Sequence, residues 1–293
     1  ELAKAEEALK NGQTEIAKEC AFRVIKDNPK CAKAYVILGK AQGFKDDKLS
    51  ISYFTDAIAI DPKYVDAYSI RALTYYIKGT SPKHKDSKVQ NLSLAIADYT
   101  KVIELSPEDA EAYKWRGNSF RHLHDYTNAI SDFTKAIELN PKSGDIYKGR
   151  ADVYYSVENW PLAIADYTRA IELIAVNETK ENKWDVYSYS ECYRLRGSSY
   201  NKIGDISRAF SDYSQAIEKN PKNYKAFMLR AIAYFDNQDY QNAVQDTTKV
   251  IELRPKEARA FALRSFSYAR IGDYEKANED YAMAESLGFD FSQ

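Results

Sequence analysis

The chain has 293 residues, and its 42 lysines and arginines almost balance its 43 aspartates and glutamates, which argues against a general binder of nucleic acids or anionic membranes. Apolar residues make up 44% of the chain and aromatic residues 13%, a composition that builds a core and excludes a disordered chain. With only 11 glycines and 8 prolines, turn-rich all-β folds and glycine-rich phosphate loops are disfavoured and a helical fold is favoured.

The cysteine content and the hydropathy of the chain limit the cellular compartments in which it is expected. The three cysteines, Cys20, Cys31 and Cys192, show no paired spacing, so neither a disulfide framework nor a zinc site is indicated. The apolar runs are too short for a transmembrane helix, and no signal peptide opens the chain. We therefore expect a cytoplasmic protein, although the start at Glu1 is compatible with a removed targeting segment.

Prolines recur at a nearly constant spacing. Six of the eight follow helix-like segments such as "AIELNP" and "VIELRP", namely Pro29, Pro62, Pro107, Pro141, Pro221 and Pro255. Their sequence numbers differ successively by 33, 45, 34, 80 and 34, which corresponds to a period of 34 with two insertions. Such a period predicts an array of repeated units, each about two helices long.

Each unit carries one stripe of aromatic and small residues at helical spacing, which predicts two helices joined by a polar turn. In the fourth unit the stripe consists of Tyr113, Gly117, Phe120, Ala129, Phe133 and Ala136. Small residues let two helices approach, and aromatic residues fill the space beside them. In chain order the predicted units cover residues 1–31, 32–64, 65–109, 110–143, 144–177, 190–223, 224–257 and 258–293.

Two insertions interrupt this register. Residues 80–92 lie between the two helices of the third unit, are polar and basic, and are expected to form a solvated loop. Residues 175–187 separate the fifth and sixth units and replace the expected proline. We expect them to extend one or both flanking helices.

The order of aromatic, small and proline positions resembles the tetratricopeptide repeat (TPR) over essentially the whole chain. The resemblance implies an all-α fold, a right-handed α-solenoid (superhelix) of about eight helix-turn-helix repeats in a single array over residues 1–293. It also implies a protein-binding scaffold or adaptor.

An arginine replaces the leucine that the family usually carries before the small residue. Each arginine is followed by an aspartate at a sequence spacing of 16, or of 27 in the unit that contains the first insertion. On an antiparallel helix pair these two positions lie level, roughly 12 Å from the turn at 1.5 Å per residue. An anion-binding ladder of arginines is the functional alternative, but each arginine has its own counter-charge. We therefore predict six structural ion pairs beside the core: Arg71–Asp98, Arg116–Asp132, Arg150–Asp166, Arg196–Asp212, Arg230–Asp246 and Arg264–Asp280.

Catalytic and metal-binding motifs are absent from the sequence. The only imidazoles belong to His84, His122 and His124, which we expect on the solvated surface. No nucleophile elbow, HExxH motif or glycine-rich strand-to-helix loop is present. We therefore expect no enzymatic activity, no metal and no cofactor.

In the family, first helices line a concave groove at offsets −2, +1, +5 and +8 from the opening aromatic residue. Carried over to this chain, these offsets imply a polar stretch of mixed charge followed by an apolar stretch, and exposed apolar patches usually mark a contact. The implied peptide-binding residues are Lys114, Asn118, Arg121, Lys148, Arg194 and Asn201 in the polar stretch, and Met228, Ile232, Phe235 and Phe266 in the apolar one.

The family's carboxylate clamp for acidic chaperone tails does not match. Lys114 and Asn118 fit its first two places, but Gly149, Glu191 and Leu195 stand where Asn, Lys and Arg are needed. An acid in place of a base repels a terminal carboxylate, so we do not expect chaperone-tail binding.

Two classes of function are compatible with these patterns. The first is a non-catalytic adaptor whose groove binds an extended or helical segment of a partner protein. The second is the substrate-recognition or regulatory region of a larger enzyme. The apolar stretch has two further candidate occupants, the chain's own Phe289 and Phe291 or a second copy in a homodimer through the C-terminal repeat. Nucleic-acid binding and membrane insertion are not expected, because acids interleave with the bases of the groove and no long apolar run is present.

Overall fold

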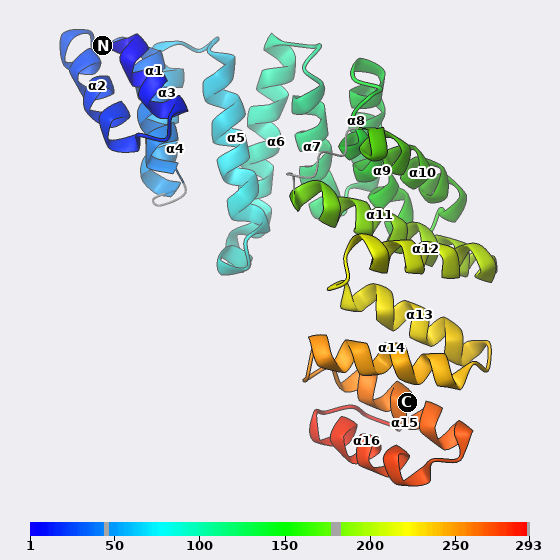
Figure 1. The fold of residues 1–293 in the computed structure, drawn as a ribbon. Helices are drawn as coiled ribbons and strands as arrows, with labels where there is room; N and C mark the ends of the chain where they lie inside the picture. Colours follow the sequence, from blue (N-terminus) through cyan, green and yellow to red (C-terminus); the bar gives the residue numbers. More distant parts are fainter. Residues whose placement is uncertain (44–46, 177–182, 292–293) are drawn as a thin grey trace. The chain divides into compact units, whose positions relative to one another are not determined.

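The computed structural model describes residues 1–43, 47–176 and 183–291, and Figure 1 shows them as helices joined by short connections. Within these residues, sixteen α-helices pair into eight hairpins of sequential helices and no strand is present. This confirms the predicted all-α fold of helix-turn-helix repeats. Close contacts divide the chain into two compact units, Glu1–Lys142 (unit 1) and Ser143–Gln293 (unit 2).

Each unit contains four hairpins. In unit 1 they are α1 (Leu2–Lys10) with α2 (Thr14–Asp27), α3 (Ala32–Gln42) with α4 (Asp47–Ile60), α5 (Val65–Thr80) with α6 (Lys88–Leu105), and α7 (Ala110–His122) with α8 (Tyr126–Leu139). In unit 2 they are α9 (Gly144–Ser156) with α10 (Trp160–Val176), α11 (Lys183–Lys202) with α12 (Ile206–Lys219), α13 (Tyr224–Asp236) with α14 (Tyr240–Leu253), and α15 (Ala258–Ile271) with α16 (Tyr274–Ser286).

Four of the turns inside the hairpins share one construction. A residue with positive φ follows the first helix, and the aspartate after it caps the second. His124 has φ 63°, and the carboxylate of Asp125 accepts a hydrogen bond from the backbone N–H of Asn128 at 3.2 Å. The same arrangement recurs at Gly204–Asp205, Gln238–Asp239 and Gly272–Asp273. These short capped turns bring the two helices of a hairpin side by side.

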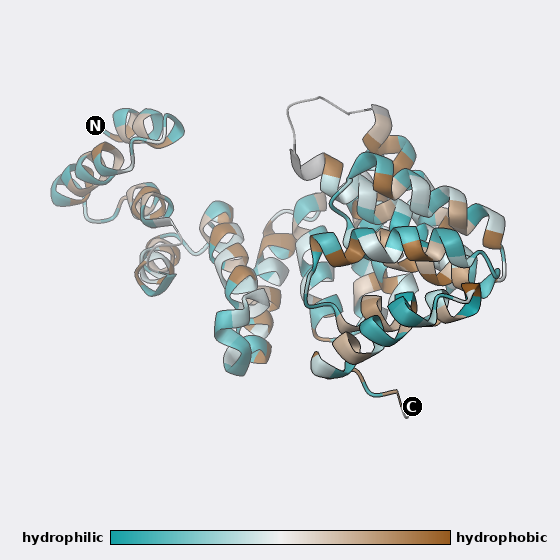
Figure 2. Cartoon of the chain, turned by 60° about the horizontal axis from the view of Figure 1, so that its bottom comes forward, coloured by the Kyte–Doolittle hydropathy of each residue, from teal (hydrophilic) through white to brown (hydrophobic). Residues whose placement is uncertain are grey.

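The core lies between the helices and consists of small residues facing aromatic ones. Figure 2 shows hydrophobic and hydrophilic residues on different faces of the same helices. In the fourth hairpin Ala129, Phe133 and Ala136 are fully buried. In the second hairpin a Cβ added to Gly39 would lie 2.3 Å from the ring of Phe54, the shortest such distance among the described glycines. The alternation of small and large residues is therefore needed for helix contact.

The first insertion differs from the predicted solvated loop. A short 3₁₀ helix, η2 (Pro82–Ser87), follows α5, and α6 then begins at Lys88. The side chains of Asn91 and Leu92 are buried, whereas Val89 is exposed. The polar composition of the segment did not predict this extra helical turn, because Leu92 is the only large apolar residue of the segment that reaches the core. Only residues 81–87 connect the two helices.

The second insertion lengthens both neighbouring helices, as expected. Helix α10 runs to Val176 and α11 begins at Lys183, so they contain 17 and 20 residues, whereas α12 and α14 contain 14. The middle of the insertion, residues 177–182, lies outside the described residues.

Within unit 2, the first helices form one continuous layer. Helices α9, α11, α13 and α15 each contact the next, whereas the second helices of successive hairpins make at most isolated contacts with one another. In unit 1, α1 contacts α3 and α5 contacts α7, but α3 and α5 make at most isolated contacts. We call the side formed by the first helices the first-helix face.

Candidate functional site

The first-helix face carries the residues predicted to bind a peptide. In unit 1 the polar members lie on α7 and contact one another. The ammonium of Lys114 lies 2.7 Å from Glu111 and over the ring of Trp115, and only 13% of its side chain is exposed. Asn118 donates from its amide to the carbonyl of Lys114 at 3.1 Å, and Arg121 donates to the Asn118 side chain at 3.3 Å. These side chains are therefore held by their own helix.

In unit 2 the first polar member is held in the same way. Lys148 donates to one carboxylate oxygen of Asp152 at 3.0 Å, and the hydroxyl of Tyr167 donates to the other oxygen at 2.8 Å. Burial, followed by the nearby charge of Asp152, raises the pKa of Tyr167, so its hydroxyl remains a donor at all ordinary pH values. The half-buried Asp152 thus joins the two helices of its hairpin.

Arg194 is the second cation of unit 2 that is bound by a carboxylate of its own helix. Its guanidinium binds Glu191 through two hydrogen bonds, at 3.0 and 2.7 Å. The amide of Asn223, on the next hairpin, donates to Glu191 at 3.1 Å and to Ser190 at 2.9 Å. Burial alone would raise the pKa of Glu191, but the bonds from Arg194 and Asn223 lower it below its ordinary value. The remaining predicted polar residue, Asn201, is half-buried on the same helix as Arg194.

Three cations of the polar stretch are therefore neutralised by carboxylates of the same helices. Lys114, Lys148 and Arg194 each have a carboxylate three or four residues away on their own helix. A partner that competed for these cations would have to displace a bonded carboxylate. The face keeps hydrogen-bonding capacity but offers little free charge at these three positions.

The predicted apolar stretch is smaller than the sequence indicates. Ile232 is 37% exposed and Phe266 is 46% exposed, and each lies five residues after the opening aromatic of its helix. Met228 and Phe235 are half-buried, and the ring of Phe235 packs edge-on against Tyr240. Ala262, which the sequence places on the same stripe, is buried. Exposed apolar area is thus concentrated on Ile232 and Phe266.

The chain's own C-terminal segment reaches this area. The ring of Phe291 stacks on Tyr281, with centroids 4.0 Å apart, and meets Phe266 edge-on at 5.7 Å. Phe289 packs against Phe291 at 4.8 Å and belongs to the apolar cluster of the last hairpin. An aromatic side chain therefore already contacts Phe266, which nevertheless remains half exposed.

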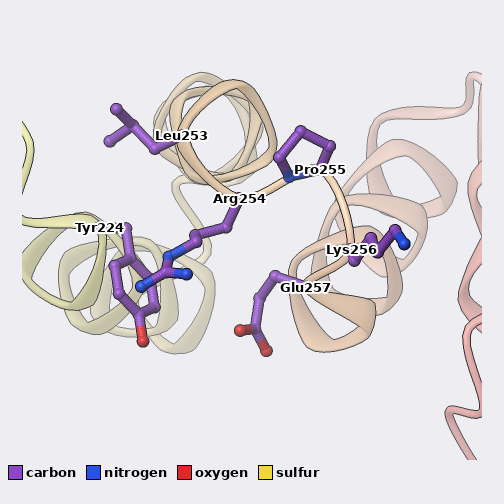
Figure 3. Close-up of a pocket in the computed structure, with 6 residues that line it drawn as sticks. All are labelled: Tyr224, Leu253, Arg254, Pro255, Lys256 and Glu257. Atoms are coloured by element: carbon purple, nitrogen blue, oxygen red, sulfur yellow. The ribbon is translucent and has the colours of Figure 1, made fainter.

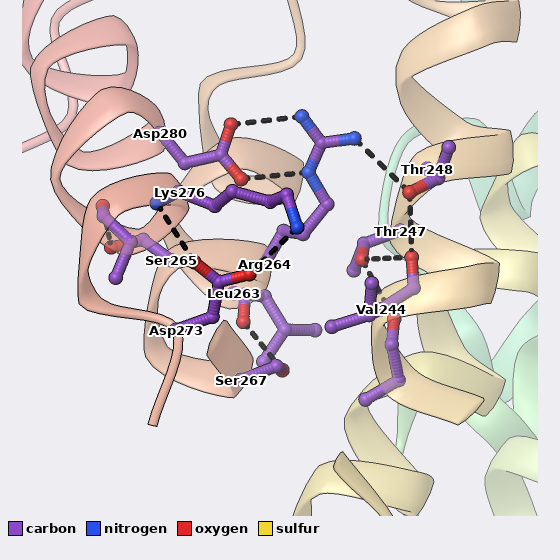
Figure 4. A network of polar contacts seen from close by, with 12 residues as sticks. Val244, Thr247, Thr248, Leu263, Arg264, Ser265, Ser267, Asp273, Lys276 and Asp280 are labelled. Carbon is purple, nitrogen blue, oxygen red and sulfur yellow. Dashed lines mark hydrogen bonds and ion pairs between the residues drawn. The ribbon is translucent and has the colours of Figure 1, made fainter. Parts of the chain in front are cut away.

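The six arginines predicted to pair with aspartates do so in the structure, each within its own hairpin. Figure 4 shows Arg264, whose Nε and Nη2 donate to the two oxygens of Asp280 at 2.7 and 2.8 Å. The corresponding bonds of the other five pairs are between 2.7 and 2.9 Å. The aspartates are buried, so the guanidinium plane of each arginine is fixed and unavailable as an anion site.

A second role of these arginines was missed by sequence reasoning. The remaining guanidinium nitrogen of Arg264 donates to the hydroxyl of Thr248, which belongs to the preceding hairpin, at 3.0 Å (Figure 4). Four other arginines make the same bond, Arg71 to Thr55, Arg116 to Thr100, Arg196 to Thr168 and Arg230 to Ser214. A hydroxyl residue 16 positions before most of these arginines is the sequence signal that could have found it.

A further cavity lies at the junction between α14 and α15. It measures about 480 Å³ and is lined by Tyr224, Leu253, Arg254, Pro255, Lys256 and Glu257 (Figure 3). The guanidinium of Arg254 lies over the ring of Tyr224 at 4.7 Å. This contact joins the end of α14 to the start of α13, within one hairpin.

The described residues contain no group of three or more His, Cys, Asp and Glu side chains arranged to hold a metal ion. Burial raises the pKa of the Cys192 thiol to about 12, so it is protonated and a poor nucleophile. His124 is exposed, as predicted, but His122 is half-buried with its ring against Tyr76 at 5.7 Å, because α7 packs against α5. His84 is also half-buried.

None of the described helices combines the length and the apolarity that crossing a bilayer requires.

Comparison with known proteins places these features in a family. One tetratricopeptide repeat model matches residues 110–143, and a second matches residues 2–65 and 194–258. Together these ranges span more than half of the chain.

Solved structures with the same repeat architecture are numerous. YrrB, described as a TPR protein with an unusual peptide-binding site, matches 66% of this chain and 93% of its own at 23% identity, with a TM-score of 0.54. The C-terminal part of a TPR repeat-containing protein from Cytophaga hutchinsonii matches 98% of this chain and 95% of its own at 17% identity, with a TM-score of 0.63. A chain of the APC/C hetero-tetramer Cut9–Hcn1 matches 90% of this chain and 48% of its own at 16% identity, with a TM-score of 0.64. At these identities the likeness shows the fold.

Proposed function

The chain belongs to the tetratricopeptide repeat family, and on that premise we propose that it is a non-catalytic scaffold that binds a segment of a partner protein on its first-helix face. The repeats support a protein-binding role in general. The description of YrrB as a peptide-binding TPR protein is consistent with the finer proposal that a peptide or helix is bound.

One observation carries the proposal. Ile232 on α13 and Phe266 on α15 occupy equivalent positions, one repeat period apart, and both remain exposed on adjoining helices. Elsewhere in unit 2 this position holds Asp152 and Ser198, which are hydrogen-bonded to tyrosines. Two exposed apolar side chains in a polar row make an anchor for an apolar side chain of a partner.

The polar residues give the site its second component. Lys148 on α9, and Arg194 and Asn201 on α11, belong to the same layer of first helices as the anchor in unit 2. Lys114, Asn118 and Arg121 lie on α7 of unit 1. Because the cations are already paired, these side chains would contribute hydrogen bonds to a partner backbone more than net charge. The partner segment is therefore expected to be apolar at its centre and only weakly charged.

The test compares two variants in which glutamate replaces exposed apolar residues. Ile232→Glu with Phe266→Glu places charge on the proposed anchor, whereas Leu162→Glu places it on an equally exposed apolar residue of a second helix. Affinity capture from the source cells, quantified by mass spectrometry, is expected to lose specific partners with the double variant and keep them with Leu162→Glu. Recovery of the same proteins by all three forms would contradict the proposal. Light scattering over a concentration series separates loss of a partner from loss of self-association.

A further inference from the structure

Two cavities open on the first-helix face of unit 1, where α3 and α5 separate. The larger, about 260 Å³, is lined by residues of α1, α3 and the start of α5, and the smaller, about 170 Å³, by residues of α3, α4 and α5. Lys40 lines both. The two cavities therefore adjoin along one side of α3.

The smaller cavity is apolar because of its lining. Phe54 forms one wall and is almost fully buried, and Ile70 and Leu73 of α5 line the cavity as well. Gly39 and Gly43 of α3 contribute no side chains to fill the space. In unit 2 each first helix contacts the next one, whereas α3 and α5 make at most isolated contacts and leave this space between them.

The larger cavity carries unbalanced positive charge. Three lysines and two acids line it, and one lysine, Lys33, is already paired with Glu6 at 2.6 Å. Among the described residues neither Lys10 nor Lys40 makes an ion pair, and both side chains are exposed. This differs from Lys114, Lys148 and Arg194, which are held by carboxylates of their own helices.

We propose that these two cavities bind a short acidic segment of a partner protein, which places an apolar side chain against Leu73 and Phe54 and a carboxylate beside Lys10 and Lys40. The ammonium groups supply the charge that the segment complements. The apolar cavity supplies an anchor of limited size, suited to a leucine-sized side chain. Asp66, the remaining acid of the larger cavity, is an acceptor for a backbone N–H of the bound segment.

This site is separate from the anchor at Ile232 and Phe266. It lies wholly in unit 1, takes a different chemistry, and does not use any residue of the carboxylate clamp pattern. The proposal shares with the proposed function only the premise that the first-helix face binds protein segments, so the two can fail independently.

The experiment uses the full chain and a fluorescein-labelled peptide, Gly-Ser-Glu-Leu-Glu-Glu-Leu-Ser-Gly, followed by fluorescence anisotropy. One control peptide carries Lys in place of every Glu, and another carries Ser in place of both Leu residues. Saturable binding is expected for the Glu/Leu peptide, about tenfold weaker binding for the Glu/Ser peptide, and none for the Lys/Leu peptide. Affinity is expected to fall as salt is raised, because exposed charges are screened.

The protein variants locate the binding. Lys10→Glu with Lys40→Glu is expected to weaken binding at least tenfold, and the control Lys26→Glu, which reverses an exposed charge on α2, to leave it unchanged. Circular dichroism and thermal melting check that the exposed substitutions leave the fold intact. The Ile232→Glu, Phe266→Glu variant is expected to bind the peptide normally.

Three results would overturn the proposal. The first is an absence of saturable binding up to about 1 mM peptide. The second is equal binding of the Glu/Leu and Lys/Leu peptides. The third is binding that survives the double lysine variant, which places the contact elsewhere. If the peptide binds only through Ile232 and Phe266, the proposed function stands and this inference fails.

Discussion

The Nη1 atom of Arg264 donates a hydrogen bond at 3.0 Å to the hydroxyl of Thr248, a residue of the preceding hairpin, while Nε and Nη2 of the same guanidinium hold Asp280 in its own hairpin. One side chain therefore fixes the packing of two helices and ties that pair to its neighbour. In a repeat array each hairpin is stabilised mainly by such nearest-neighbour contacts. This bond is one that the leucine usual in the family at this position could not form.

Replacing Thr248 by Val is expected to lower the free energy of unfolding by about 1 kcal/mol, because the methyl group that replaces the hydroxyl cannot accept the arginine's hydrogen bond. Urea denaturation followed by circular dichroism measures the effect. The matched variant Thr248→Ser keeps a hydroxyl and is expected to retain most of the stability. A loss in Thr248→Ser together with no loss in Thr248→Val would show that the methyl group of Thr248, and not its hydroxyl, is what matters.

Replacing Asp132 by Ala is expected to cost about 3 kcal/mol, because it leaves the guanidinium of Arg116 without its buried counter-charge. The side chain of Asp132 is 7% exposed, so solvent cannot replace it. Chemical denaturation gives the value. A loss below about 0.5 kcal/mol would show instead that the pair behaves as a surface ion pair.

The double variant Arg116→Leu with Asp132→Tyr copies the second hairpin, where Leu38 packs with Tyr53 and no ion pair is present. It is expected to recover most of the stability lost in Asp132→Ala, because it removes both charges and replaces them with apolar surface. A double variant less stable than Asp132→Ala would show that the local packing, and not the unpaired charge, sets the cost.

Removing one hydroxyl group from each of two buried tyrosines is expected to have opposite effects. Tyr167 donates to Asp152 at 2.8 Å, so Tyr167→Phe should destabilise the protein by about 1 kcal/mol. The buried hydroxyl of Tyr99 has no hydrogen-bond partner among the described residues, because Leu73 stands where the other hairpin has Asp152. Tyr99→Phe should therefore be neutral or stabilising by up to about 1 kcal/mol. Thermal unfolding of both variants tests the contrast, and a clear loss in Tyr99→Phe would refute it.

Acid is expected to weaken unit 2 through Glu191. Its pKa is lowered below the ordinary value of 4.5, because bonds from Arg194 and Asn223 outweigh the effect of burial. A lowered pKa stabilises the folded state above pH 4.5, and this stabilisation is lost as the pH falls through the folded value. Glu191→Gln should therefore be less stable than the parent at pH 7, with the difference shrinking towards pH 3. Glu285→Gln, at an exposed position, is the control, and its stability relative to the parent should change little with pH.

Repetition made the fold predictable. A constant repeat period multiplies each local signal, so that turns, small residues and aromatic residues could be placed in eight hairpins without any long-range information. The same register predicted the six arginine–aspartate pairs, because two positions equally far from one turn must lie level in a hairpin. The extra turn of α6 was missed, because Leu92 alone marks it as buried among polar neighbours.

The site was less predictable, because the register assigns a residue to a face but does not say what that residue contacts. Lys114 and Arg194 lie on the predicted face, yet each is bonded to an acid three residues before it on the same helix. Phe266 is exposed on one side and meets Phe291 on another. Spacing alone cannot separate these cases.

The amino-acid sequence by itself determined the helical hairpins, their number and the charge pairs inside them, because these depend on residues a fixed distance apart along the chain. The tertiary structure decided which hairpins are tied together through Thr248 and its counterparts, which cations of the first-helix face remain unpaired, and where α3 and α5 leave space between them. These features depend on the distance between helices of different hairpins, which side-chain packing sets and no periodic pattern encodes.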